Sequence, residues 1–139
     1  MIKTVLFVCI HNSGRSQMAE AFFNRMAQGK AKALSAGTRP SEGINPIAVE
    51  AMKELGIDIS NKKPKILTMD MIKSADKMIT MGCGADTEDV CPARFIKTED
   101  WALEDPQGKS IEDVRKIRDE IKRRVSSLIS QLSSEEVIK

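Results

Sequence analysis

The sequence is poor in aromatic residues and has an odd number of cysteines, and both features limit what the chain can be. It has no tyrosine, one tryptophan and four phenylalanines among 139 residues. Its three cysteines are an odd number, which does not suit a structural disulfide framework. In a reducing cytoplasm such cysteines are free thiols, metal ligands or redox-active groups. Structural disulfides are therefore not expected.

Long hydrophobic runs and a strong net charge are also missing. No apolar stretch approaches the roughly 18 residues needed to span a bilayer, so no membrane association is predicted. The apolar run near the N-terminus is short and lacks a small-residue cleavage site, which favours a cytoplasmic protein. The net charge of +2 is too small to indicate a nucleic acid partner. The length suits one domain, predicted over residues 1–139.

Hydrophobic runs that suit buried strands alternate with patterns that suit amphipathic helices. Strands are predicted over residues 3–8, 32–37, 77–81 and 94–98. Helices are predicted from Ser16 to Gly29, from Asn45 to Gly56 and from Ser110 to Leu132. This alternation indicates an α/β layered domain with a mostly parallel sheet. Ligands of such sheets bind at the carboxyl ends of strands, and Cys9 stands at one such end.

A short loop follows the first strand, with five residues between Cys9 and Arg15. A strand-to-helix loop of this length can curl so that successive backbone N–H groups point at one centre, which makes a nest for a tetrahedral anion. The next helix adds its free N–H groups and the positive end of its dipole. Arg15 can grip two oxyanion oxygens with its planar fork. The residues expected to bind substrate are Ile10, His11, Asn12, Ser13, Gly14 and Arg15.

The same loop can activate the sulfur of Cys9. A free thiol has a pKa near about 8.5, and a helix N-terminus with a nearby cation can lower it to about 3.5–7.5. The Ser16 hydroxyl could add a hydrogen bond to the thiolate. The alternative is that Cys9 is a buried core residue, since free cysteine is often buried. His11 could be considered as a base, but its side chain is expected to point outward.

The stretch "CIHNSGRSQMAE" resembles the low-molecular-weight protein tyrosine phosphatase fold, and more specifically its arsenate reductase branch. The resemblance continues through "SAGTRP", "NPIAVEAMKELGIDIS", "ADKMITMGCG" and "EDPQGKSIEDVRKIRDEI". In the phosphatases a proline typically follows the Arg-Ser pair, whereas this chain has Gln17. The resemblance implies a three-layer α/β/α fold with a mostly parallel four-stranded sheet. It also implies arsenate reduction, with phosphatase activity on phosphate monoesters as the alternative.

The other two cysteines lie in "MGCGADTEDVCP", where seven residues separate Cys83 from Cys91. They could be unreactive core residues. They could instead join Cys9 and His11 around zinc, although the sequence lacks a close pair of cysteines and a metal would block the anion loop. No bound metal is therefore expected. The resemblance favours a third interpretation, because thiol-coupled arsenate reductases carry two cysteines in this region. In that relay Cys83 attacks the Cys9–arsenic adduct, and Cys91 then attacks Cys83.

The segment "EDPQGK" supplies a candidate general acid, Asp105, for the oxygen that leaves arsenic. An Asp-Pro pair is also a turn signal, and local sequence alone favours the turn. The resemblance places this pair on the active-site rim. In the phosphatases an aromatic pair commonly follows and clamps a phosphotyrosine ring, whereas Gln107 and Gly108 follow here. This favours a small inorganic oxyanion, with phosphate or sulfate as analogues.

The resemblance also bears on partners and ions. No bound cofactor is expected, and the presence of both Cys83 and Cys91 favours thioredoxin as the external dithiol reductant. A small thiol such as mycothiol with a glutaredoxin-like partner is the alternative. Some relatives bind potassium at a site that Asn12, Glu20 and Ser35 match in part. Because "NKKPK" follows with Lys63 and Lys65, whose ammonium groups could replace the cation, no potassium requirement is predicted. A non-catalytic redox sensor or oxyanion-binding module is the remaining functional class.

Overall fold

A parallel sheet of four strands forms the centre of the protein. The computed structural model describes residues 3–81, 98–101 and 103–138. The strands are β1 (Lys3–Cys9), β2 (Ala31–Gly37), β3 (Lys77–Thr80) and β4 (Thr98–Asp100), in the order β2-β1-β3-β4. All three pairings are parallel. Cys9 at the end of β1 lies opposite Gly37 at the end of β2, and Thr80 at the end of β3 lies opposite Asp100 at the end of β4, so the carboxyl ends share one edge of the sheet.

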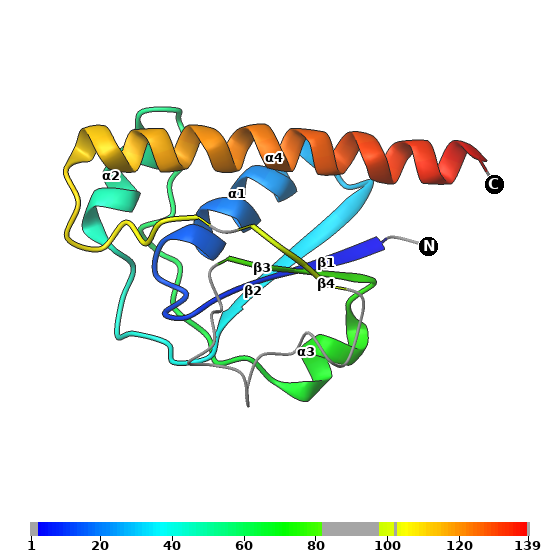
Figure 1. Ribbon diagram of the computed structural model, residues 1–139, viewed down its shortest axis with the longest axis horizontal. Coiled ribbons are helices and arrows are strands. Elements are labelled where there is room, and N and C mark those ends of the chain that lie inside the picture. The colour runs from blue at the N-terminus through cyan, green and yellow to red at the C-terminus, as the bar shows by residue number, and fades with distance from the viewer. Residues whose placement is uncertain (1–2, 82–97, 102, 139) are drawn as a thin grey trace.

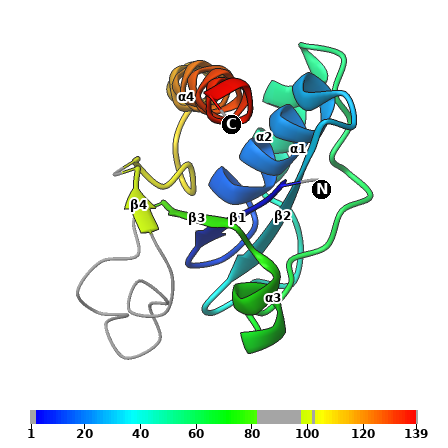
Figure 2. The ribbon, with the colours of Figure 1, turned by 90° about the vertical axis from the view of Figure 1, so that its right-hand side faces the viewer.

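Helices cover both faces of this sheet (Figures 1 and 2). Helices α1 (Arg15–Ala27), α2 (Pro46–Lys53) and α4 (Ile111–Ile138) lie on one side, and α3 (Met69–Ser74) lies on the other. The predicted three-layer fold is confirmed, and the described strands are all parallel rather than mostly so. Within the described ranges, every helix is too short or too polar to span a bilayer.

The helix boundaries follow from local sequence signals. Asn45 caps α2 by accepting the N–H of Ile47 at 2.9 Å, and Pro46 occupies the first turn. Ser110 Oγ accepts the N–H of Asp113 at 3.2 Å at the start of α4. Helix α1 ends at Ala27, two residues before the predicted stop, because Gln28 already adopts left-handed geometry with φ of 51°.

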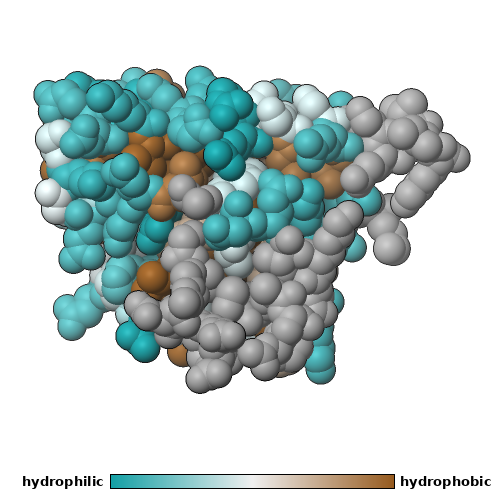
Figure 3. All heavy atoms as spheres, viewed as in Figure 1, coloured by the Kyte–Doolittle hydropathy of each residue, from teal (hydrophilic) through white to brown (hydrophobic). Residues whose placement is uncertain are grey.

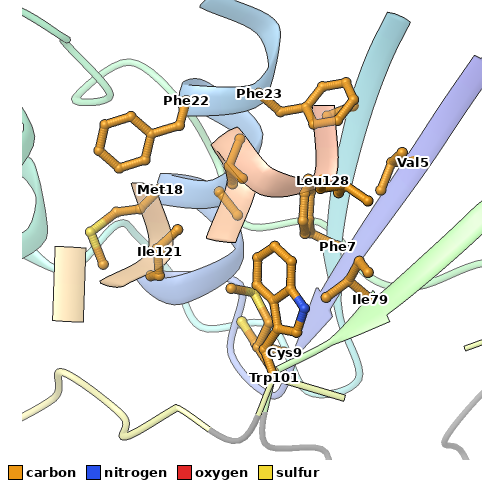
Figure 4. Close-up of a cluster of buried hydrophobic side chains, with 14 of the residues drawn as sticks. Val5, Phe7, Cys9, Met18, Phe22, Phe23, Ile79, Trp101, Ile121 and Leu128 are labelled. Atoms are coloured by element: carbon orange, nitrogen blue, oxygen red, sulfur yellow. The ribbon is translucent and has the colours of Figure 1, made fainter. Parts of the chain in front are cut away.

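Two hydrophobic clusters hold the layers together. The larger one lies between the sheet and the helices α1 and α4, and Figure 4 shows Trp101 and Cys9 within it. Most of the predicted apolar stripe of α4 is buried in this cluster, through Ile117, Ile121, Val125, Leu128 and Leu132. Val114 is also buried, whereas Ile111 at the start of the stripe is half-buried. The outer face of α4 is largely hydrophilic (Figure 3). The smaller cluster joins the opposite face of the sheet to α3 through Ile72.

Two elements differ from the sequence-based expectation. The predicted strand over residues 94–98 reaches the described structure only at Thr98, where β4 begins. Helix α3 was not predicted, because its six residues are too few to show a helical period. Thr68 nevertheless caps α3 by accepting the N–H of Met71 at 3.2 Å.

Candidate active site

The loop between β1 and α1 is anchored by its carbonyl groups. The N–H groups of Thr38, Arg39, Ser41 and Asn45 donate to the carbonyl oxygens of loop residues 9, 10, 11 and 13 at 2.8–3.2 Å. The carbonyl side of the loop therefore faces the segment that follows β2. This leaves the amide side for the centre of the loop, which is the arrangement that an anion nest requires.

Two close backbone contacts shape this loop. A Cβ atom on Gly37 would lie 2.7 Å from the carbonyl oxygen of Ile10, so only glycine lets β2 approach so closely. A Cβ atom on Gly14 would lie 2.7 Å from Cγ of Pro106. Asn12 adopts the left-handed conformation with φ of 52°, as its residue type allows.

Cys9 stands at the start of the loop, and the residue is only 2% exposed. The contacts of its sulfur are all short. The sulfur accepts the backbone N–H of Asn12 at 3.1 Å and lies 2.8 Å from Oγ of Ser16. Ser16 Oγ itself accepts from Nδ2 of Asn12 at 2.7 Å. The hydroxyl proton of Ser16 is therefore free to point at the sulfur. The Asn12 N–H and the Ser16 hydroxyl therefore both lie within hydrogen-bond distance of the buried sulfur.

Arg15 is the first residue of α1, and its side chain is only 5% exposed. One terminal nitrogen donates to the carbonyl oxygen of Leu103 at 3.0 Å, and the other lies 3.8 Å from Oδ2 of Asp105. A guanidinium has five N–H groups, so donors remain for an oxyanion. Arg15 thus joins the anion loop to residues 103–105.

The side chain of Asp105 forms the predicted turn and also faces Arg15. Its Oδ1 accepts the N–H of Gln107 at 3.0 Å, which is the turn predicted from the Asp-Pro pair. Its Oδ2 faces Arg15, and its side chain is 42% exposed. Asp105 therefore lies at the rim of the loop, open to solvent, where a general acid can exchange its proton.

His11 is half-buried, and its Nδ1 lies 3.2 Å from the carbonyl oxygen of Arg39. Because a carbonyl only accepts, Nδ1 carries the proton in this contact. His11 and Ser13 line a groove of about 310 Å³ together with Asn45 and Gln107. Ile10 contributes the loop carbonyl bound by Arg39, and its side chain is half-buried.

Cys83 and Cys91 lie outside the described residues, so their predicted roles stay predictions. The strand that precedes them in the sequence, β3, lies next to β1. Met81, just after β3, donates its N–H to the carbonyl oxygen of Val8 at 2.8 Å. The end of β3 therefore lies beside the end of β1. The zinc alternative also depends on these two cysteines. In the part of the chain that the structure describes, no three His, Cys, Asp or Glu residues are placed to hold a metal ion.

The lysines near Glu20 differ in part from the prediction. The carboxylate of Glu20 is 7% exposed, and Nζ of Lys65 lies 3.9 Å from it, as expected. The second ammonium, also at 3.9 Å, belongs to Lys62 rather than Lys63. Lys63 instead offers its backbone carbonyl to Nε2 of Gln17 at 3.2 Å.

Two contributors to the site could not be found by sequence motifs. The carbonyl of Leu103 and the amide of Lys65 act through the backbone, so their residue types carry no signal. Gln17 was noted only as a departure from the phosphatases, although its side chain bonds directly to Asn12.

The fold and the loop define a class of α/β protein that holds a cysteine and an arginine around an oxyanion nest. Residues 4–138 match the family model for low molecular weight phosphotyrosine protein phosphatase, and the chain belongs to this family.

Relatives within this family differ in activity. The arsenate reductase of Staphylococcus aureus is 38% identical over 131 residues, which cover 93% of this chain and 98% of that protein. The structure of a thioredoxin-dependent arsenate reductase from Corynebacterium glutamicum is 36% identical, with a TM-score of 0.78, over 96% of this chain and 63% of that chain. An arginine phosphatase from Geobacillus stearothermophilus is 27% identical, with a TM-score of 0.84, over 97% of this chain and 96% of that chain.

Proposed function

We propose that this protein is an arsenate reductase that converts arsenate to arsenite with Cys9 as the nucleophile. The observation that carries the proposal is the position of the Cys9 sulfur at the start of an anion loop, where it accepts the Asn12 N–H at 3.1 Å and lies 2.8 Å from Oγ of Ser16. The identity of about two in five residues with the Staphylococcus aureus arsenate reductase supports the same activity.

The first step is the formation of a sulfur–arsenic bond. The loop amides and Arg15 hold arsenate above the sulfur, and the Cys9 thiolate attacks arsenic. One arsenic–oxygen bond breaks, and the leaving oxygen takes a proton from Asp105 to depart as water. Because Arg15 contacts Asp105, the residue that binds the anion also positions the acid.

The second step reduces arsenic by two electrons. The Cys83 thiolate attacks the sulfur of the Cys9 adduct, and the electron pair of the sulfur–arsenic bond passes to arsenic. Arsenic(V) becomes arsenic(III) and leaves as arsenite, while a Cys9–Cys83 disulfide forms. Cys91 then attacks Cys83, which frees Cys9 and leaves a Cys83–Cys91 disulfide. The pairing of β3 with β1 supports this route, because Cys83 follows β3 in the sequence.

An external dithiol closes the cycle by reducing the Cys83–Cys91 disulfide. We propose thioredoxin for this role, because the chain carries both relay cysteines and the Corynebacterium glutamicum neighbour is thioredoxin-dependent. The predicted cytoplasmic location would keep such a reductant available.

The decisive experiment measures arsenite formation with thioredoxin and thioredoxin reductase. Cys9→Ser, Cys83→Ser and Cys91→Ser are each expected to lose multiple turnover. Undiminished turnover in Cys83→Ser would contradict the relay while leaving Cys9 as the nucleophile.

The alternative is phosphate monoester hydrolysis. It is supported by the similarity to the arginine phosphatase and by the family match. Arsenate and phosphate share their tetrahedral shape, so the same loop should bind both. The rim of the site favours the inorganic anion, since Gln107 and Gly108 replace an aromatic clamp. Efficient hydrolysis of an aryl phosphate that survives Cys83→Ser would favour the phosphatase.

A further inference from the structure

Gln17 is fully buried in the first turn of α1, and its side-chain amide joins two segments. Its Nε2 donates to Oδ1 of Asn12 at 3.0 Å and to the carbonyl oxygen of Lys63 at 3.2 Å. The backbone N–H of Lys65 donates to the same Oδ1 at 2.8 Å. A carbonyl oxygen has two lone pairs, and these donors occupy both. The side-chain oxygen of Asn12 is therefore fixed in place.

This fixed orientation sets the direction of the next hydrogen bonds. With Oδ1 occupied, Nδ2 of Asn12 faces Ser16 Oγ and donates to it at 2.7 Å. A hydroxyl has one proton, and the remaining partner of Ser16 Oγ is the sulfur of Cys9 at 2.8 Å. Each side chain thus points a donor at the next: Gln17 at Asn12, Asn12 at Ser16, and Ser16 at the sulfur of Cys9. These four residues are called the sulfur network below.

We propose that Gln17 is a positioning residue that keeps the Cys9 thiolate stabilised by holding Asn12 in this orientation. If the Asn12 amide turned over, its oxygen would accept the Ser16 proton and the sulfur would lose a donor. The hydrogen bonds of Gln17 go to Asn12 and Lys63 rather than to the sulfur, so Gln17 acts through Asn12. The inference concerns the nucleophile, so it holds whichever oxyanion Cys9 attacks.

The opposite end of the Gln17 amide explains why its orientation is unique. Oε1 is buried and has no hydrogen-bond partner among the described residues. Turning the amide over would place this oxygen against two other oxygens, those of Asn12 and Lys63, and lose both bonds of Nε2. The donor side of Gln17 is therefore committed to Asn12 and Lys63.

The test follows Cys9 directly and needs no arsenate. In a Cys83→Ser/Cys91→Ser background Cys9 is the only thiol, and its alkylation by iodoacetamide is measured against pH. Gln17→Met is expected to raise the midpoint pH and to slow alkylation below the midpoint by about three- to tenfold. Gln17→Glu should have a larger effect, because an ionised carboxylate cannot donate and repels the thiolate. Gln131→Met, an exposed change on α4, is the matched control and should change nothing.

Two outcomes would overturn the proposal. The first is an unchanged midpoint in both Gln17 variants, which a purely space-filling role predicts. The second is a further shift when Gln17→Met is added to Asn12→Ala, since a residue that acts only through Asn12 has no effect once Asn12 is removed. If the variants do not fold, hydrogen exchange in the unchanged protein decides, because the Lys65 amide should be protected. Exchange at the rate of an unstructured peptide would contradict the proposal.

Discussion

The sulfur network and the contacts between α2 and α4 are both polar clusters, yet they use charge in opposite ways. Around Cys9 the side chains of Asn12, Ser16 and Gln17 are neutral and buried. Gln17 donates to Asn12, and Asn12 donates to Ser16, whose Oγ lies 2.8 Å from the sulfur. Between the helices Glu54 binds Arg115 and Arg118, and Asp119 also binds Arg118, so two negative charges balance two positive ones. The second cluster is called the helix tie below. Its charged groups are paired with one another.

The difference teaches where each kind of polar contact is useful. A neutral network adds no anionic side chain that would compete with the substrate oxyanion for the loop. Arg118 also donates to the carbonyl oxygen of Ala51 on α2 at 2.9 Å, so the helix tie joins α2 to α4. Changes in the site should therefore cut activity more than stability, and changes in the tie should do the reverse.

The largest effect is expected from Arg15→Lys. Lysine keeps the charge but lacks the planar fork that binds two oxyanion oxygens and the Leu103 carbonyl together. We expect kcat/KM for arsenate to fall by about 10²–10³-fold. Arg25→Lys, at the exposed end of the same helix, is the control. Equal activity in the two variants would show that charge alone suffices.

Asp105→Asn tests the general acid and should lower kcat by about 10²-fold, at the low end for such a role. Asparagine keeps the turn with Gln107 because its oxygen still accepts, but it cannot supply the proton. The measurement is single-turnover formation of the Cys9 adduct, with Asp70→Asn on α3 as the control. A normal rate would move the proton source elsewhere.

Gly14→Ala tests how closely the anion loop must approach Pro106. The added Cβ would lie 2.7 Å from Cγ of Pro106, so the segment carrying Asp105 must shift. We expect a loss of stability of about 1–3 kcal/mol together with a severalfold fall in turnover. Gly43→Ala meets nothing within 4 Å and should leave unfolding unchanged. Urea titration of both variants measures the difference.

Glu54→Gln tests the helix tie. Hydrogen bonds from Arg115, then from Arg118, lower the pKa of Glu54 from 4.5 to about 2. A lowered pKa stabilises the fold above the unfolded value of 4.5, and this stabilisation is lost as pH falls through about 2. The variant should melt about 2–4 °C lower at pH 7 with unchanged activity. Its difference from the unchanged protein should shrink between pH 4.5 and pH 2.

Replacing sodium by potassium at constant ionic strength should change the turnover rate least of all. Two ammonium groups already lie 3.9 Å from the Glu20 carboxylate. Lys65→Met removes one of these ammonium groups, so its turnover rate should depend more on potassium than that of the unchanged protein. Strong activation of the unchanged protein by potassium in a steady-state assay would contradict this prediction.

The sequence predicts the residues that act through side chains better than those that act through the backbone. The spacing of Cys9, Arg15 and Ser16 is enough to predict a loop at a strand end, and the structure places Oγ of Ser16 2.8 Å from the sulfur of Cys9. The position of Asp105 beside Arg15 came from the family resemblance, because the local signal was only a turn. The Leu103 carbonyl and the Lys65 amide depend on contacts between distant segments. No residue type marks such contacts.

The packing of Trp101 has an optical consequence. The chain has no tyrosine, so this indole is the only strong near-ultraviolet emitter in the protein. It is 2% exposed, packs against Phe7 with ring centroids 5.7 Å apart, and shares its cluster with Cys9 (Figure 4). Its backbone N–H also donates to Thr80, at the strand end that precedes Cys83 in the sequence. The unlabelled protein therefore carries a built-in fluorescent reporter in the same hydrophobic cluster as Cys9.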